Sequence, residues 1–158
     1  MRRTGPVDLL VAFVLLGGVS YVALHAYYDS MPPLQGLVAL PLFALAVVEF
    51  EMARRVRLAV RHDPNARPMQ AIVIARCVAL GKASALVGAG VAGAAAALLL
   101  RVLPHAQQVR VAGNDSRVGL LALAAALLLL AAGLLLERAG VDPGRERRER
   151  SEGRADGR

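Results

Sequence analysis

Residues 83–100 read ASALVGAGVAGAAAALLL, eighteen consecutive positions without a charged side chain. They show no polar face, whereas an amphipathic helix of a soluble protein places polar residues along one side. An uncharged apolar run of about eighteen residues is long enough to cross the hydrocarbon core of a bilayer as a helix. This stretch therefore predicts a membrane-spanning helix, with which the rest of the chain can be compared.

Three further stretches have the same apolar character and are separated by turn-forming residues. Pro6 and Asp8 suit the first turn of a helix, and Pro32-Pro33 separates that helix from the next. The second stretch is the weakest prediction, because its uncharged part ends at Val48. The third helical pattern runs from near Pro68 to about Val102, which is more residues than a bilayer needs. Its first turns are therefore expected at or beyond the membrane surface. The predicted spans cover about residues 7–28, 34–53, 78–102 and 118–136.

The segments between and after these spans are polar. Pro104–Ser116 is predicted to be a loop that ends in residues typical of a helix N-cap. Gly140 and Pro143 are expected to stop the last helix. Residues 1–140 then form one all-α membrane domain, a bundle of four transmembrane helices. Residues 141–158 are strongly charged and almost free of apolar side chains, so this tail is expected to be disordered.

The distribution of Lys and Arg predicts the orientation of the chain. Two lie before the first span, seven between Arg54 and Lys82 and seven from Arg138 onward, against three between Arg101 and Arg117. Cytoplasmic segments of membrane proteins are enriched in Lys and Arg. Both termini and the middle loop are therefore expected in the cytoplasm, in a multi-pass protein of the cytoplasmic (inner) membrane. The net charge of +7 then requires no nucleic-acid partner.

Glu49, Arg76 and Lys82 are the most informative charged residues. They lie near the predicted cytoplasmic ends of the second and third spans, where a buried charge is costly. If these two spans form an antiparallel hairpin, Glu49 and Arg76 both lie about 12 Å from its turn and can meet. Three interpretations are open: interfacial anchors that extend their side chains toward water, a structural ion pair, or a group that acts in transport or catalysis.

A stripe of small residues is the second signal in the third span. Small residues at every fourth position allow two helix backbones to approach closely. The stripe predicts either tight packing within one bundle, which we favour, or a homodimer face. Its candidate packing residues are Gly81, Ala85, Gly88, Ala89 and Gly93.

No recognised catalytic or metal-binding motif accompanies these features. Cys77 is the single cysteine and lies in an apolar stretch, which excludes an intrachain disulfide. The three histidines are not spaced as metal ligands, and the chain contains no phosphate-binding glycine loop or nucleophile elbow. We therefore expect no cofactor and no enzymatic activity.

Several segments resemble a family of small actinobacterial membrane proteins that is classed as domain of unknown function 3180. The resemblance covers about residues 5 to 138 and leaves the charged tail outside. It implies a fold with four membrane spans and no defined activity. The matching segments are Ser30–Leu34, Glu49 with Arg54–Arg57, Ala75–Leu86, Gly88-Ala89, Ala92-Gly93 and Leu103-Pro104.

These features favour a non-enzymatic accessory or scaffold protein that acts through helix packing and its cytoplasmic loop. Its expected partners are the lipid bilayer and either another membrane protein or further copies of the chain. The alternative is a small oligomeric transporter or channel subunit. Transporters usually keep their sites near the midplane of the membrane, whereas the charged residues of this chain lie near one edge.

Overall fold

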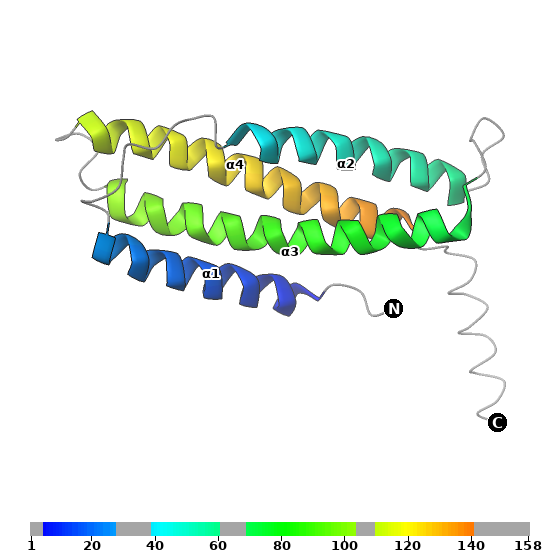
Figure 1. Ribbon diagram of the computed structural model, residues 1–158, viewed down its shortest axis with the longest axis horizontal. Coiled ribbons are helices and arrows are strands. Elements are labelled where there is room, and N and C mark those ends of the chain that lie inside the picture. Colours follow the sequence, from blue (N-terminus) through cyan, green and yellow to red (C-terminus); the bar gives the residue numbers. More distant parts are fainter. Residues whose placement is uncertain (1–4, 28–38, 61–68, 104–109, 141–158) are drawn as a thin grey trace, which may run out of the picture.

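The computed structural model describes residues 5–27, 39–60, 69–103 and 110–140, with the backbone only for residues 110–113. These residues form four helices, as predicted (Figure 1). Three are long and apolar enough to span a membrane: α1, α3 and the part of α4 from Asn114 to Ala139. Of the predicted features, the turn of the hairpin between the second and third spans, within residues 61–68, and the tail 141–158 lie outside the described residues. The helices are α1 (Pro6–Tyr27), α2 (Ala39–Val60), α3 (Ala71–Val102) and α4 (Arg110–Ala139).

The start of α1 follows from its sequence. Pro6 occupies the first helical position, where its missing N–H costs no hydrogen bond. The backbone N–H of Gly5 donates a hydrogen bond of 3.0 Å to the Asp8 carboxylate, and the N–H of Asp8 donates one of 3.1 Å to the Gly5 carbonyl oxygen. This reciprocal arrangement resembles a capping box and fixes the beginning of the helix.

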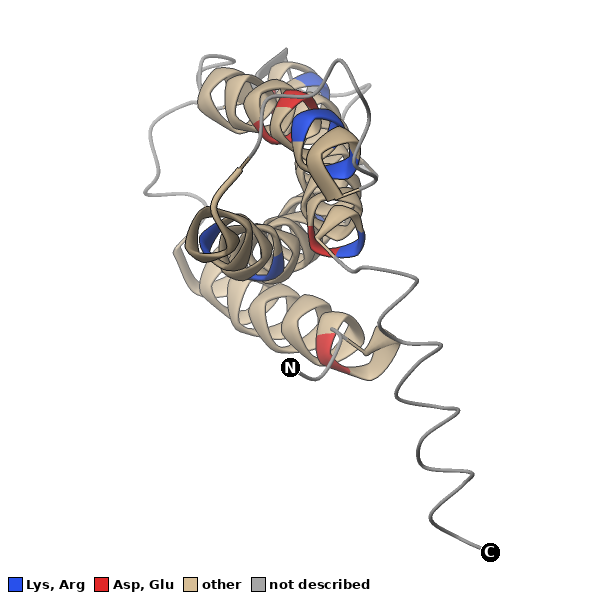
Figure 2. Ribbon diagram, turned by 90° about the vertical axis from the view of Figure 1, so that its right-hand side faces the viewer, with Lys and Arg blue, Asp and Glu red and all other residues tan. Residues whose placement is uncertain are grey.

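The four helices form a curved row rather than pairing in chain order. α1 packs on α3, α3 on α4, and α4 on α2, and among the described residues α1 touches neither α2 nor α4. Figure 1 shows α4 between α2 and α3, and the end-on view in Figure 2 shows α1 and α2 at opposite edges of the row. Most of the buried residues belong to α3 and α4, the two helices at the centre of the row.

The expected hairpin of the second and third spans is therefore wrong as a packing unit. α2 packs mainly on α4 and has only a small contact with α3. The reason lies in α4, whose small residues Ala132 and Ala139 accept the buried side of α2. Two helices that follow each other in the chain are here separated in space by the last helix.

The beginning of α4 also differs from the prediction. The helix starts at Arg110, two turns before the predicted start at Val118, so the expected loop through Ser116 is helical in its second half. Asn114, Asp115 and Ser116 would serve as N-cap residues, yet they lie inside the helix, and each takes part in a polar or electrostatic contact. Satisfied side chains remove the advantage that such residues gain from a cap or turn.

Glycine contacts define how α3 and α4 are aligned. A Cβ atom on Gly81 would come 2.7 Å from the Gly133 carbonyl oxygen, and one on Gly88 would come 2.7 Å from the Leu130 backbone nitrogen. As residue numbers rise in α3 they fall in α4, so the two helices are antiparallel. Carried to the far end of the row, this alignment places Arg101 level with Asp115.

The two outer helices are aligned by similar contacts. α1 runs parallel to α3, because Gly17 lies against Gly93 and Leu24 packs with Leu98 and Val102. Its first turn is therefore level with the start of the uncharged run at Ala83. The first turns of α3 and the last turns of α2 project beyond α1 at this end (Figure 1).

Candidate functional site

Glu49 lies at the centre of the contact between α2 and the rest of the row. The buried residues of α2 recur at intervals of three and four, which is the spacing of one helix face. Glu49 is one of them and has 0% of its surface exposed. These residues are Ala46, Glu49, Ala53 and Val56.

The surroundings of Glu49 are almost entirely apolar. Toward one end of α2, Ala46 packs with Leu129 and Ala132 of α4. Toward the other end, Ala53 and Val56 join a cluster with Cys77, Leu136 and Ala139 that links α2, α3 and α4. The Glu49 carboxyl group thus lies between two apolar clusters.

One polar side chain, Ser84 of α3, lies beside the Glu49 carboxyl group, and it is buried as well. Ser84 is not hydrogen-bonded to Glu49, because neither carboxyl oxygen of Glu49 has a hydrogen-bond partner in the part of the chain that the structure describes. A buried polar atom without a partner is uncommon and is unfavourable in free energy. Glu49 is therefore the residue whose position most needs an explanation.

The other two members of the predicted charge group differ from Glu49 in their burial. Arg76 is exposed on the first turns of α3. Lys82 is half-buried and has a contact of its own, but neither cation is hydrogen-bonded to Glu49 among the described residues. The pairing of Glu49 with Arg76 or Lys82 stays a prediction.

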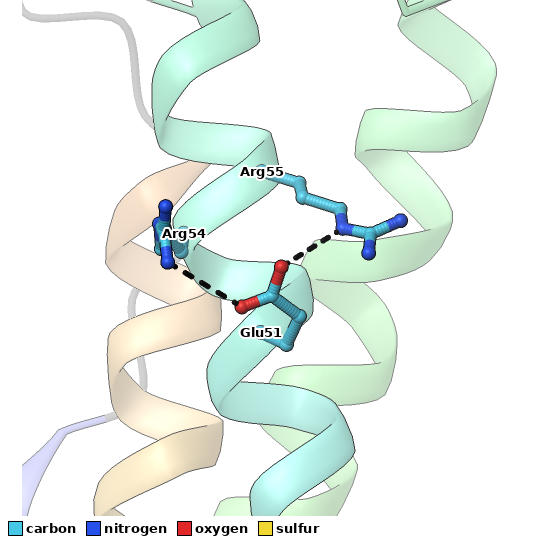
Figure 3. A network of polar contacts seen from close by, with 3 residues as sticks. All are labelled: Glu51, Arg54 and Arg55. Atoms are coloured by element: carbon cyan, nitrogen blue, oxygen red, sulfur yellow. Dashed lines mark hydrogen bonds and ion pairs between the residues drawn. The ribbon is translucent and has the colours of Figure 1, made fainter.

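Glu51 has the environment that Glu49 lacks, although the two residues are only two positions apart. Its carboxylate is 3.1 Å from Nε of Arg55 and 3.9 Å from Nη1 of Arg54, both on the same helix (Figure 3). The two arginine side chains are largely exposed, and the Glu51 side chain is about half exposed. Such exposed pairs contribute little to stability, so Glu51 serves as a natural comparison for Glu49.

The small residues of α3 face two different helices. Gly81, Ala85 and Gly88 lie against α4, where a Cβ on Gly133 would come 2.7 Å from the Ala85 nitrogen. Gly93 lies against α1, because a Cβ there would collide with the carbonyl oxygen of Phe13. Ala89 is also buried, with 1% of its surface exposed. The stripe thus packs within one chain and serves two neighbours of α3.

Two buried acids were missed by the sequence interpretation. Asp115 lies in α4 near its start and Glu137 near its end, and both take part in contacts. Asp115 was assigned to a loop, which hid its place on a buried helix face. Glu137 directly follows the run Leu134-Leu135-Leu136, and this position at the end of an apolar run was the available signal.

Charged residues occupy two levels of the row, with an uncharged layer between them. Lys82 and Glu137 lie near one edge and Arg101 and Asp115 near the other. Residues 83–100 of α3 separate the two levels and span roughly 27 Å at 1.5 Å per residue. This thickness is close to that of a bilayer core. Among the described residues no group of three or more His, Cys, Asp or Glu could hold a metal ion.

A family model described as a protein of unknown function (DUF3180) matches residues 9–143, which is most of the chain. The chain belongs to the DUF3180 family. This assignment confirms the resemblance found in the sequence, and the family description names no activity. No curated protein and no solved structure matches the chain. The structure of this DUF3180 protein must therefore supply the functional argument on its own.

Proposed function

We propose that this DUF3180 protein crosses the cytoplasmic membrane four times, with both termini in the cytoplasm. α1, α3 and α4 have the length and apolar character of spans. α2 would be the fourth span, since its uncharged part packs at the level of the apolar layer. In the sequence, the preceding residues 34–38 are uncharged as well. The excess of Lys and Arg in the head, the middle segment and the tail supports the orientation.

We propose further that the protein is a non-enzymatic accessory or scaffold subunit. The observation that carries this proposal is the uncharged layer. Within it, α3 meets α1 on one side and α4 on the other through glycine and alanine, almost backbone to backbone. Such an interior offers neither a lining for a polar solute nor a set of reactive groups. The outward faces of α1 and of the first half of α2, up to Phe50, are mostly apolar and suited to contact with lipid or with another span.

The alternative is a small oligomeric transporter or channel subunit, and one observation favours it. Glu49 is a buried acid without a hydrogen-bonding partner, and ionisable residues at membrane depth often belong to ion or proton pathways. It lies near one edge of the layer, however, and the described residues continue no polar path from it toward the other edge.

Purification in mild detergent followed by native mass spectrometry separates the two functions. For a scaffold we expect a second membrane protein at a fixed ratio to this chain, retained through a size-exclusion step. Recovery of the chain alone, as a homo-oligomer with enough copies to form a closed ring, would contradict the scaffold function and support the transport function. Recovery as a monomer without a partner would contradict both.

A further inference from the structure

A negative charge on Glu49 would be costly in free energy. The side chain is fully buried, both carboxyl oxygens lack a hydrogen-bond partner within the described residues, and apolar clusters lie on both sides. An isolated carboxylate in such surroundings is strongly unfavourable, while a neutral carboxyl group loses far less on burial. Something must therefore neutralise the group while α2 is packed on α4.

No charged side chain on the neighbouring helices is hydrogen-bonded to Glu49 within the described residues. On α2, Glu51 is the next acid and is paired with Arg54 and Arg55 on the exposed side. On α3, Lys82 comes half a turn before Ser84 and makes its own contact. On α4, Glu137 lies about one turn beyond the level of Glu49, and it is an acid with a contact of its own.

A metal cation fits the surroundings poorly. Hard cations take about six oxygen ligands. Near Glu49 the described side chains provide the two carboxyl oxygens and the Ser84 hydroxyl group, while the backbone carbonyl groups belong to continuous helices. A proton needs no further ligand. The neutral carboxyl group has an O–H that can donate a hydrogen bond to the Ser84 hydroxyl oxygen after a small side-chain rotation.

We propose that Glu49 is a proton-binding site of this DUF3180 protein, occupied while α2 packs on α4 and vacated when α2 moves away and exposes the side chain to water. Packing of α2 is then coupled to uptake of one proton. The proposal stands on the geometry around Glu49 and does not depend on the scaffold function. It gives the interface between α2 and α4 a chemical role in addition to packing.

Labelling with a hydrophobic carbodiimide tests for the bound proton. A protonated carboxyl group adds across a C=N bond of dicyclohexylcarbodiimide, its proton passes to nitrogen, and acyl transfer gives a stable N-acylurea that retains the whole reagent. The full-length protein in lipid vesicles is treated, digested and analysed by mass spectrometry. We expect the adduct on Glu49, its loss in Glu49→Gln, and its progressive loss as the pH is raised.

Glu51 is the matched control because it lies two positions away on the same helix. Its exposed, ion-paired carboxylate should react with a water-soluble carbodiimide and amine rather than with the hydrophobic reagent. Labelling of Glu51 but not of Glu49 by the hydrophobic reagent, in protein that keeps its native elution volume, would overturn the proposal.

Unfolding experiments provide a second readout that does not require labelling. If only the folded form binds the proton, the free energy of unfolding falls as the pH rises, because the folded state then binds more protons than the unfolded state. Glu49→Gln, which is neutral at every pH, should lose this dependence, while Glu51→Gln should keep it. A Glu49→Gln variant that is destabilised and is rescued by Lys82→Met or Arg76→Met would show an ion pair instead and would refute the proton site.

Discussion

Gly81 of α3 and Gly133 of α4 face each other at a point where neither helix has room for a side chain. A Cβ on Gly81 would lie 2.7 Å from the Gly133 carbonyl oxygen, and a Cβ on Gly133 would lie 2.6 Å from the Gly81 carbonyl oxygen. Because both obstacles are backbone atoms, a side chain could be accommodated only by separating the helices. This contact lies close to Ser84, and thus to the position of Glu49.

Gly133→Ala should therefore lower the free energy of unfolding by about 1–3 kcal/mol, the usual cost of overpacking a tight interior. Thermal unfolding in detergent measures the effect. Gly18→Ala is the matched control, since a Cβ on Gly18 meets no atom within 4 Å. Equal stability of the two variants would contradict close packing at the Gly81–Gly133 contact.

Gly93→Val should detach α1 without unfolding the remaining helices. A side chain at Gly93 would collide with the Phe13 backbone. Among the described helices, α1 packs on α3 alone. Cross-linking of cysteines introduced at Leu24 and Leu98, which pack together, monitors the attachment in a Cys77→Ala background. The yield should fall in Gly93→Val and remain unchanged in Gly18→Val, and a preserved yield in both would show that α1 is held differently.

Arg101 and Asp115 should be energetically coupled, because the alignment of α3 and α4 brings them to the same level and Asp115 is buried. We expect Arg101→Met and Asp115→Asn to destabilise the protein individually and the double variant to recover part of the loss. A double-mutant cycle from chemical unfolding should give a coupling free energy of about 1–3 kcal/mol. The exposed pair Glu51–Arg55 should give a much smaller value. Strict additivity for Arg101 and Asp115 would argue against the coupling.

Reporter fusions test the proposed orientation. Fusions after Arg61 and in the tail should show cytoplasmic activity, and fusions after Pro33 and Gln108 should show activity outside the membrane. The reason is the strong excess of Lys and Arg in the segments assigned to the cytoplasm. A cytoplasmic signal from Gln108 would exclude the four-span arrangement.

The helices themselves were largely predictable from composition. Pro6 with Asp8 located the beginning of α1, and the uncharged run from Ala83 located the apolar part of α3, because both signals are local. The start of α4 was not predictable in the same way. Asn114, Asp115 and Ser116 favour a cap by their intrinsic chemistry, yet all three lie within the helix and take part in polar or electrostatic contacts.

The neighbours of each helix could not be derived from the sequence. The stripe of small residues in α3 indicated close packing but could not tell whether Gly88 and Gly93 face the same helix. They face α4 and α1 respectively. The burial of Glu49 was equally hidden, because it depends on α4 rather than on the helix that follows α2 in the chain. Its charge singled out Glu49 in the sequence, and the fold shows that its carboxyl oxygens have no hydrogen-bond partner among the described residues.

The order of the helices in the row has a consequence for biogenesis. In the proposed four-span arrangement, α1 and then α2 reach the membrane first, yet these two helices share no contact among the described residues. α1 must wait for α3, and α2 must wait for α4, so each early helix is surrounded by lipid until the second half of the protein has been synthesised. In that arrangement the row is complete only after α4, the last helix of the chain, has been inserted.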